Sequence, residues 1–262
     1  MIELKINGSA PKVTLVGAGP GALDLITLRG INAIKSAQVI LYDALVDKRM
    51  LDHAPKAKKV FVGKRKGYKR FSQEELNELI VHYAVNYGNV VRLKGGDSFV
   101  FGRGTEEMTY AAAFGIETEV VPGLSSVTSV PASAGVPVTH RNVARSFWAL
   151  TGTSSNGVIN QDLSLAAKST ATIVVLMGMS KLNEIVSIFS TNGKSNTPVS
   201  VIQNGTTERE KIGVGTVSTI TEVVKRKKLS SPAIIIIGEV VKESLQFAEF
   251  FQKALPQSKK AS

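Results

Sequence analysis

Cysteine is absent from this chain of 262 residues. Its absence excludes a disulfide framework, a zinc site built from thiolates and a cysteine nucleophile. Histidine is also scarce, because the chain has only His53, His82 and His140, spaced too widely in the sequence to indicate a metal cluster. We therefore expect no metal site.

Long apolar runs are missing as well. None approaches the roughly 18 to 20 residues that a membrane-spanning helix requires, and the N-terminal segment lacks the basic region and apolar stretch of a secretory signal. A hydrophobic content of 43% with 20% charged residues is typical of a globular protein. We therefore expect a cytoplasmic location and no membrane partner.

Acidic residues are few compared with basic ones. The 32 Lys and Arg against 21 Asp and Glu give a net charge of +11, which favours an anionic partner such as nucleic acid, an anionic membrane surface, or a polycarboxylate or phosphate ligand. Eight of the basic residues lie between Lys56 and Arg70, with no acid among them. This segment is either a solvated charged loop or a loop that presents several cations to one ligand.

Strand-like and helix-like patterns alternate along the chain. Apolar runs that predict strands occupy residues 12–17, 37–43, 58–63, 89–97 and 117–123, and a second series occupies 146–152, 171–178, 197–205, 210–217 and 233–241. Helical periodicity lies at 23–37, 72–88 and 180–193, and the second of these begins with Ser72 and Glu75 in capping-box spacing. The alternation predicts an α/β fold, with a largely parallel sheet in the first half.

Proline and glycine cluster between residues 120 and 139, which indicates the join between two halves. We therefore expect an N-terminal extension over residues 1–12, an α/β domain over 13–122, a second α/β domain over 123–252 and a tail over 253–262.

The first glycine loop follows the strand that begins at Val13, in the segment VTLVGAGPGALDLITL. Gly17, Gly19 and Ala22, with Asp43 a little over twenty residues later, nearly match the fingerprint of a dinucleotide-binding site. The same glycines would serve any tight turn between a strand and a helix. This motif alone therefore leaves a nicotinamide or flavin enzyme and an unrelated fold equally open.

A second loop, between Val90 and Met108, is richer in glycine. It places Gly95, Gly96, Gly102 and Gly104 among charged residues that include Arg92, Lys94, Asp97, Arg103, Glu106 and Glu107. Glycine and charge together at the carboxyl end of a strand favour a backbone that approaches a ligand closely. A purely structural turn stays possible for Gly102 and Gly104.

Several motifs together resemble those of the tetrapyrrole methylases, and within that group those of the uroporphyrinogen-III C-methyltransferases. They are VTLVGAGPG, VFVGKRKG, QEELNELIV, VVRLKGGDSFVFGRGTEE, VVPGLSS, AGVPVTHR, TPVSVIQNGT and SPAIIIIGEVV, in order from about Val13 to Phe251. The resemblance implies two α/β domains with a cleft between them for S-adenosylmethionine, which leaves as S-adenosylhomocysteine. It also implies a homodimer.

The resemblance carries site residues over by position. Those matching positions that hold the cofactor are Pro20, Gly95, Gly96, Asp97, Val100, Ser125, Ser126, Met177 and Gly205. Asp43 and Lys64 match residues proposed as proton acceptor and donor, and Arg103, Glu106 and Arg141 match charged groups that face the tetrapyrrole. Without the resemblance, Met177 at the end of an apolar strand would be assigned to the core.

The expected reaction is the methylation of uroporphyrinogen III at C2 and C7, which yields precorrin-2. The eight carboxylates of that substrate suit a basic surface that includes Lys64, Arg65, Arg103 and Arg141. The protein's main task is to align the pyrrole carbon with the methyl group and sulfur. The proton acceptor stays open between Asp43 and Glu106.

The chain departs from the family pattern at a few positions. Ser98, Thr105, Ser133, Thr153 and Leu176 stand where the family usually has Pro, Gly, Tyr, His and Tyr. Leu176 lies beside the predicted cofactor position, so the packing of the cofactor is where we expect a difference.

Three alternatives remain. One is a tetrapyrrole methylase that acts on a later corrinoid intermediate or another target, and the second is an NAD-dependent oxidoreductase built on the first glycine loop. The third, a nucleic-acid-binding module, lacks basic residues interleaved with the aromatic side chains on which bases stack, since aromatics make up 6% of the chain. We therefore expect no nucleic-acid partner.

Overall fold

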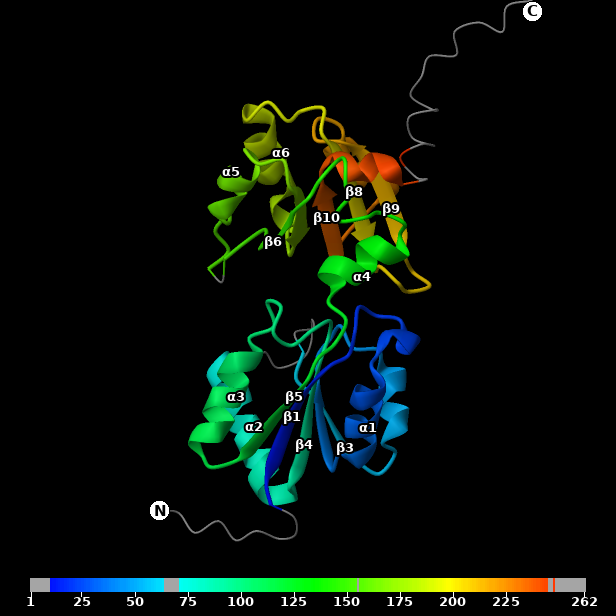
Figure 1. Cartoon of the computed structure of the whole chain (residues 1–262). Coiled ribbons are helices and arrows are strands. Elements are labelled where there is room, and N and C mark those ends of the chain that lie inside the picture. Colours follow the sequence, from blue (N-terminus) through cyan, green and yellow to red (C-terminus); the bar gives the residue numbers. More distant parts are fainter. Residues whose placement is uncertain (1–9, 64–70, 155, 245–246, 248–262) are drawn as a thin grey trace, which may run out of the picture. The chain divides into compact units, whose positions relative to one another are not determined.

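The computed structural model describes residues 10–63, 71–154, 156–244 and 247. The chain divides after Ser125 into two compact units. In the described residues, each unit is built on one five-stranded sheet (Figure 1).

The sheet of the first unit is entirely parallel, with the strand order β3-β2-β4-β1-β5. Its strands are β1 (Lys12–Gly17), β2 (Val39–Tyr42), β3 (Lys58–Phe61), β4 (Asn89–Lys94) and β5 (Glu117–Val121). Each coincides with one of the predicted apolar runs, so the predicted parallel sheet is confirmed. The central strands are buried on both faces, which is why their sequences read as continuous apolar runs.

Helices cover both faces of this sheet. Helix α1 (Leu28–Ser36) lies on one face with the short 3-10 helices η1 (Leu23–Leu25) and η2 (Lys48–His53), while α2 (Gln73–Tyr87) and α3 (Gly104–Ala113) lie on the other (Figure 1). Each face therefore has its own apolar core. The result is a three-layer α/β/α unit.

Local sequence determines where these helices begin and end. The capping box of α2 is confirmed: Ser72 Oγ accepts from the Glu75 N–H, the Glu75 carboxylate accepts from the Ser72 N–H, and Gly88 follows the last turn. The helix predicted over 23–37 is in fact split. Helix α1 begins only at Leu28, with Thr27 as its N-cap, so the first glycine loop does not open directly onto a helix N-terminus as a dinucleotide site would require.

The second unit has a mixed sheet with the order β6-β7-β10-β8-β9. Only β6 and β7 are parallel in the described residues, whereas β10 runs antiparallel to both β7 and β8, and β9 antiparallel to β8. Its strands are β6 (Phe147–Thr151), β7 (Thr172–Leu176), β8 (Pro198–Gln203), β9 (Lys211–Thr216) and β10 (Ala233–Ile237). The predicted strands are therefore present, but the last strand inserts between two earlier ones.

One face of this second sheet packs against α5 (Asp162–Ala166), α6 (Leu182–Thr191) and α7 (Ile220–Lys227). Helix α4 (Ser126–Ser133) contacts β10, and the 3-10 helix η4 (Glu239–Glu243) contacts β8. The further 3-10 turn η3 (Met179–Lys181) leads from β7 into α6. Across the described residues, no helix combines the length and the apolar character needed to cross a membrane.

Candidate functional site

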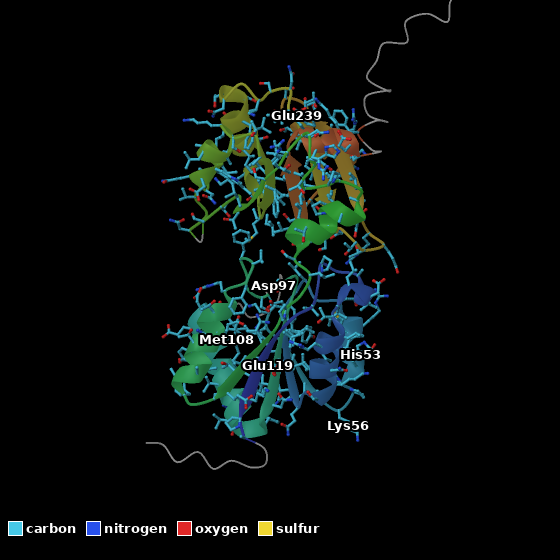
Figure 2. The ribbon with its side chains drawn as sticks, viewed as in Figure 1. His53, Lys56, Asp97, Met108, Glu119 and Glu239 are labelled. Atoms are coloured by element: carbon cyan, nitrogen blue, oxygen red, sulfur yellow. The ribbon has the colours of Figure 1, made fainter. Side chains whose placement is uncertain are left out.

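The carboxyl edge of the first unit's sheet gathers most of the predicted site residues of that unit. Parallel strands point their carboxyl ends to one edge, and open α/β sheets bind ligands there. Figure 2 shows Asp97, after β4, at this end of the unit and Lys56, before β3, at the opposite end. The loops after β1, β2, β4 and β5 therefore form the candidate site of the first unit.

Three of these loops touch through bare backbone. Gly96 N–H donates to Gly19 O at 2.7 Å, and Gly19 N–H donates back to Gly96 O at 3.2 Å. A Cβ on Gly123 would lie 2.4 Å from Gly96 O, and one on Gly17 would lie 2.6 Å from the Gly123 Cα. The chain's own packing therefore requires glycine at Gly17 and Gly123.

The structural interpretation that the sequence left open for Gly102 and Gly104 is correct. A Cβ at either position would lie 2.6 Å from the carbonyl oxygen of Ser98. Gly95 is similarly confined, since its Cβ would lie 2.9 Å from the Leu45 Cβ. The glycine-rich sequence thus folds a compact loop onto itself at the edge of the sheet.

Asp97 ties two of the loops together. Its Oδ1 accepts from the Phe99 N–H at 2.8 Å and its Oδ2 accepts from the Gly123 N–H at 2.9 Å. Both oxygens of this half-buried carboxylate are therefore engaged with backbone, at a position that the resemblance assigns to the cofactor. Any ligand that uses Asp97 has to share these oxygens.

The remaining predicted cofactor positions near this edge are half-buried. They are Pro20 after β1, Val100 in the loop after β4, and Ser125 and Ser126 after β5. Around them, four apolar side chains are 44% to 62% exposed: Leu45, Phe99, Phe101 and Leu124. Exposed apolar side chains gathered at one edge mark a ligand or partner surface.

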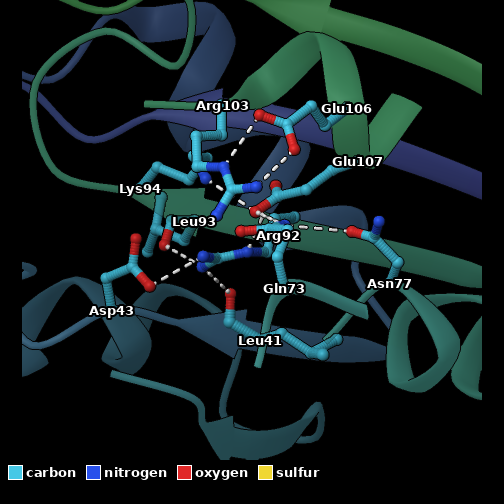
Figure 3. Close-up of polar contacts among 10 residues, drawn as sticks. All are labelled: Leu41, Asp43, Gln73, Asn77, Arg92, Leu93, Lys94, Arg103, Glu106 and Glu107. Carbon is cyan, nitrogen blue, oxygen red and sulfur yellow. Dashed lines mark hydrogen bonds and ion pairs between the residues drawn. The ribbon is translucent and has the colours of Figure 1, made fainter. Parts of the chain in front are cut away.

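A set of four charged residues, which we call the Arg92 network, consists of the partly exposed Asp43 and the buried Arg92, Lys94 and Glu107 (Figure 3). Arg92 Nη2 donates to Asp43 Oδ1 at 2.7 Å, and Arg92 Nε faces Glu107 Oε2 at 3.4 Å. Lys94 Nζ donates to Glu107 Oε1 at 2.8 Å. The side chains of Arg92 and Glu107 are 2% and 0% exposed, and burial, as the main cause, lowers the pKa of Lys94.

Strand register creates this network. Because β2 and β4 are neighbours with Leu41 opposite Arg92, the Asp43 that follows β2 lies near the guanidinium. Arg92 and Lys94 are two residues apart on β4 and face α3, which supplies Glu107. The sequence predicted a role for Asp43, and it named Arg92, Lys94 and Glu107 among the charged residues of the second glycine loop without assigning a role to any of the three. The available signal was a pair of cations in an otherwise apolar strand, since buried cations need acidic partners.

Arg103 and Glu106 form a separate ion pair, drawn above this network in Figure 3. Arg103 donates from Nε to Glu106 Oε1 at 2.8 Å and from Nη2 to Glu106 Oε2 at 2.5 Å, and both side chains are about half exposed. The hydrogen bonds from Arg103 lower the pKa of the Glu106 carboxyl. Lys64 and Arg65 lie outside the described residues.

The predicted site residues of the second unit follow its strands. Met177 comes directly after β7, has a φ of 53° and is 55% exposed, so its assignment to the core without the resemblance would have been wrong. Gly205 follows β8 between Asn204 and Thr206, which have φ values of 49° and 67°. Such strained positions in non-glycine residues are typical of ligand sites.

In the second unit, Gly205 is closely packed and Arg141 is exposed. A Cβ on Gly205 would lie 2.3 Å from Val130 Cγ1, so this glycine lets α4 approach the loop. Arg141 lies exposed in the loop before β6, where its carbonyl oxygen accepts from Arg145 Nε at 3.4 Å. In the part of the chain that the structure describes, no group of three or more His, Cys, Asp or Glu could hold a metal ion.

Comparisons with known proteins show which family this chain resembles. Residues 12–221 match the model of the family described as tetrapyrrole (corrin/porphyrin) methylases. A uroporphyrinogen-III C-methyltransferase of Methanocaldococcus jannaschii is 45% identical over 233 residues, 88% of this chain and 96% of that protein. An S-adenosyl-L-methionine-dependent uroporphyrinogen III methyltransferase of Methanosarcina barkeri is 42% identical over 240 residues, 90% of this chain and 94% of that protein.

Similarity extends to a longer protein and to a solved structure. A siroheme synthase of Actinobacillus pleuropneumoniae is 40% identical over 97% of this chain, which spans only 53% of that protein. The crystal structure of a uroporphyrin-III C-methyltransferase of Thermus thermophilus, complexed with S-adenosylhomocysteine, is 38% identical. It matches with a TM-score of 0.76 over 88% of this chain and 99% of that one.

Proposed function

The chain belongs to the tetrapyrrole methylase family, and from this premise we propose that it is an S-adenosylmethionine-dependent C-methyltransferase acting on uroporphyrinogen III. The product is precorrin-2, formed by methylation at C2 and C7 with release of two molecules of S-adenosylhomocysteine. The observation that carries the proposal is 45% identity over 96% of an enzyme named for this reaction.

The types of side chain exposed in the two units suit S-adenosylmethionine, the methyl donor. In the first unit, the exposed apolar side chains at the carboxyl edge, Leu45 and Phe99 among them, are of a kind that can contact a nucleoside or a methionine chain, and in the second unit the exposed Met177 is of the same kind. The donor would supply an electrophilic methyl group on sulfur. We assign its binding to Pro20, Gly95, Gly96, Asp97, Val100, Ser125, Ser126, Met177 and Gly205.

Asp97 acts in this proposal mainly through the backbone it holds. Its two hydrogen bonds fix the loops after β4 and β5, and with them the positions assigned to the donor. Loops whose backbone is fixed in this way can orient the methyl donor and the acceptor toward each other. For a transfer between two bound molecules, this orientation is the main contribution that the protein makes.

The geometry favours Asp43 over Glu106 as proton acceptor. Both oxygens of Glu106 accept from Arg103, which lowers the pKa of that carboxyl and weakens it as a base. In Asp43, only Oδ1 is bonded, and Oδ2 has no hydrogen-bond partner among the described residues. We therefore assign proton acceptance to Asp43, proton donation to Lys64, and contacts with the substrate carboxylates to Arg103, Glu106 and Arg141.

Three further assignments belong to the proposal. The chain acts as a homodimer in the cytoplasm, and its two domains cover residues 13–122 and 123–252. The support is the family resemblance together with the division of the chain after Ser125. Analytical ultracentrifugation of the purified protein tests the dimer, because a monomer at micromolar concentration would refute it.

The activity is tested by anaerobic incubation with uroporphyrinogen III and S-adenosylmethionine, followed by mass spectrometry. A product heavier by two methyl groups supports the proposal. A protein that methylates only a later corrinoid in the same panel would refute it in favour of a related methylase.

Calorimetric titration distinguishes the proposed methyltransferase from an NAD-dependent oxidoreductase. We expect binding of S-adenosylhomocysteine at one per chain and no binding of NAD. Binding of NAD alone would overturn the proposed function.

A further inference from the structure

Contacts on several sides fix the guanidinium of Arg92. Besides its bond to Asp43, Nη1 donates to the carbonyl oxygens of Leu93 at 3.2 Å and Leu41 at 3.5 Å. Because Arg92 is 2% exposed and its guanidinium is a rigid planar fork, these contacts determine where Nη2 points. The backbone of β2 and β4 thus orients the group that holds Asp43.

Asp43 lies where the Arg92 network reaches the carboxyl edge of the sheet. Its side chain is 29% exposed, while that of its partner Arg92 is 2% exposed. One carboxylate oxygen is therefore held from the interior at 2.7 Å, and the other is left without a partner among the described residues. This is the arrangement that a fixed proton acceptor requires.

Glu107 supports the network from the opposite side. Its fully buried carboxylate lies against Arg92 and accepts from Lys94 Nζ at 2.8 Å and from Gln73 Nε2 at 3.5 Å. A buried cation without an acid would be strongly destabilised. Two acids and two cations balance in the Arg92 network, so Glu107 compensates the buried charge of Arg92 and helps to hold its side chain in place.

We propose that Arg92 is a positioning residue for methyl transfer, which holds the Asp43 carboxylate through Oδ1 so that Oδ2 receives the proton that the substrate releases after a pyrrole carbon has been methylated. In this step a C–H bond of the methylene bridge beside the methylated ring breaks, its electron pair enters the ring system and neutralises the positive charge left by methylation, and the proton passes to Oδ2. The proposal rests on the proposed function, because it takes Asp43 as the proton acceptor.

A double-mutant cycle tests the coupling. Arg92→Met and Arg92→Lys are each made alone and together with Asp43→Asn, and kcat and KM for uroporphyrinogen III are measured. Arg92→Met should lower kcat about 100-fold, the effect of misplacing a reacting group by about 1 Å, with KM little changed. Arg92→Lys, which keeps the charge and loses the fork, should retain more activity than Arg92→Met.

The decisive comparison is in the Asp43→Asn background. If Arg92 acts through Asp43, Arg92→Met causes no further loss of kcat there. Losses that multiply would overturn the proposal, because Arg92 would then act independently of Asp43. Lys12→Met is the matched control, since Lys12 forms ion pairs with Glu117 and Glu119, both at 2.9 Å, at the start of β1, and it should leave kcat unchanged.

Crystal structures of the wild type and Arg92→Lys provide a readout independent of activity. We expect the Asp43 carboxylate to move or to adopt several conformations in the variant, and an unchanged carboxylate would overturn the proposal. A wild-type protein that fails to methylate uroporphyrinogen III would refute the proposed function, while the two crystal structures would still decide whether Arg92 positions Asp43.

Discussion

Gly123→Ala tests whether backbone contact between loops holds the candidate site together. The new Cβ would lie 2.4 Å from Gly96 O and 2.7 Å from both the Gly17 C and Cα atoms. All three obstacles are backbone atoms and cannot rotate away as a side chain would. Overpacking typically costs about 1 to 3 kcal/mol, and with backbone on two sides we expect the upper end, about 3 kcal/mol.

Thermal unfolding measures this effect. A loss of about 3 kcal/mol should lower Tm by roughly 6 to 12 °C in a chain of this size. The matched control is Gly115→Ala, because a Cβ there meets nothing within 4 Å, although the backbone has a φ of 72°. Its cost is conformational, roughly 1 to 2 kcal/mol, so its Tm should fall less, by roughly 2 to 8 °C.

The same variants separate stability from binding. Gly123→Ala should also weaken binding of S-adenosylhomocysteine in calorimetry, because it displaces the loop that Asp97 holds, whereas Gly115→Ala should bind normally. A Tm for Gly123→Ala within about 2 °C of the wild type, well below the roughly 6 °C expected, would show that the loops do not depend on this contact.

Three further predictions follow from single contacts. Asp97→Asn leaves the Phe99 or the Gly123 N–H unpaired and should cost about 1 to 3 kcal/mol in denaturant unfolding; an unchanged midpoint would contradict the assigned role. Met177→Ala should leave stability within about 0.5 kcal/mol of the wild type, because the side chain is largely exposed. It should also weaken S-adenosylhomocysteine about tenfold in calorimetry, and unchanged affinity would remove Met177 from the site. The pKa of Glu106 is lowered in the folded protein, so the ionised carboxylate stabilises the fold at any pH above its unfolded pKa of 4.5, and this stabilisation is lost as the pH falls through the lower folded pKa. The difference in Tm between wild type and Glu106→Gln should therefore shrink on acidification. A difference that stays constant from pH 7 to acid would refute the pairing with Arg103.

Local features of the first unit could be read from the sequence. Its apolar runs became parallel strands because both faces of the sheet are covered, and the spacing of Ser72 and Glu75 produced the capping box of α2. Such features depend on residues that are neighbours along the chain. The family motifs likewise indicated which loops carry the candidate site, since each motif is a short continuous segment.

Other features of the fold and of the candidate site depend on contacts between residues that are far apart in the sequence. Asp43 and Arg92 are 49 residues apart in the chain, and only the adjacency and register of β2 and β4 bring them within hydrogen-bond distance. The same holds for the insertion of β10 between β7 and β8, which makes the second sheet mixed.

The glycines show most clearly which features the sequence determines and which the tertiary structure decides. The sequence determined by itself that the loops after β1 and β4 would be glycine-rich and that the loop after β5 would contain Pro122 and Gly123. Only the tertiary structure decided why: Gly17 and Gly123 leave room for backbone from other loops at distances that no side chain permits. A sequence pattern records that a Cβ is absent, but which atoms occupy its place depends on how distant segments pack.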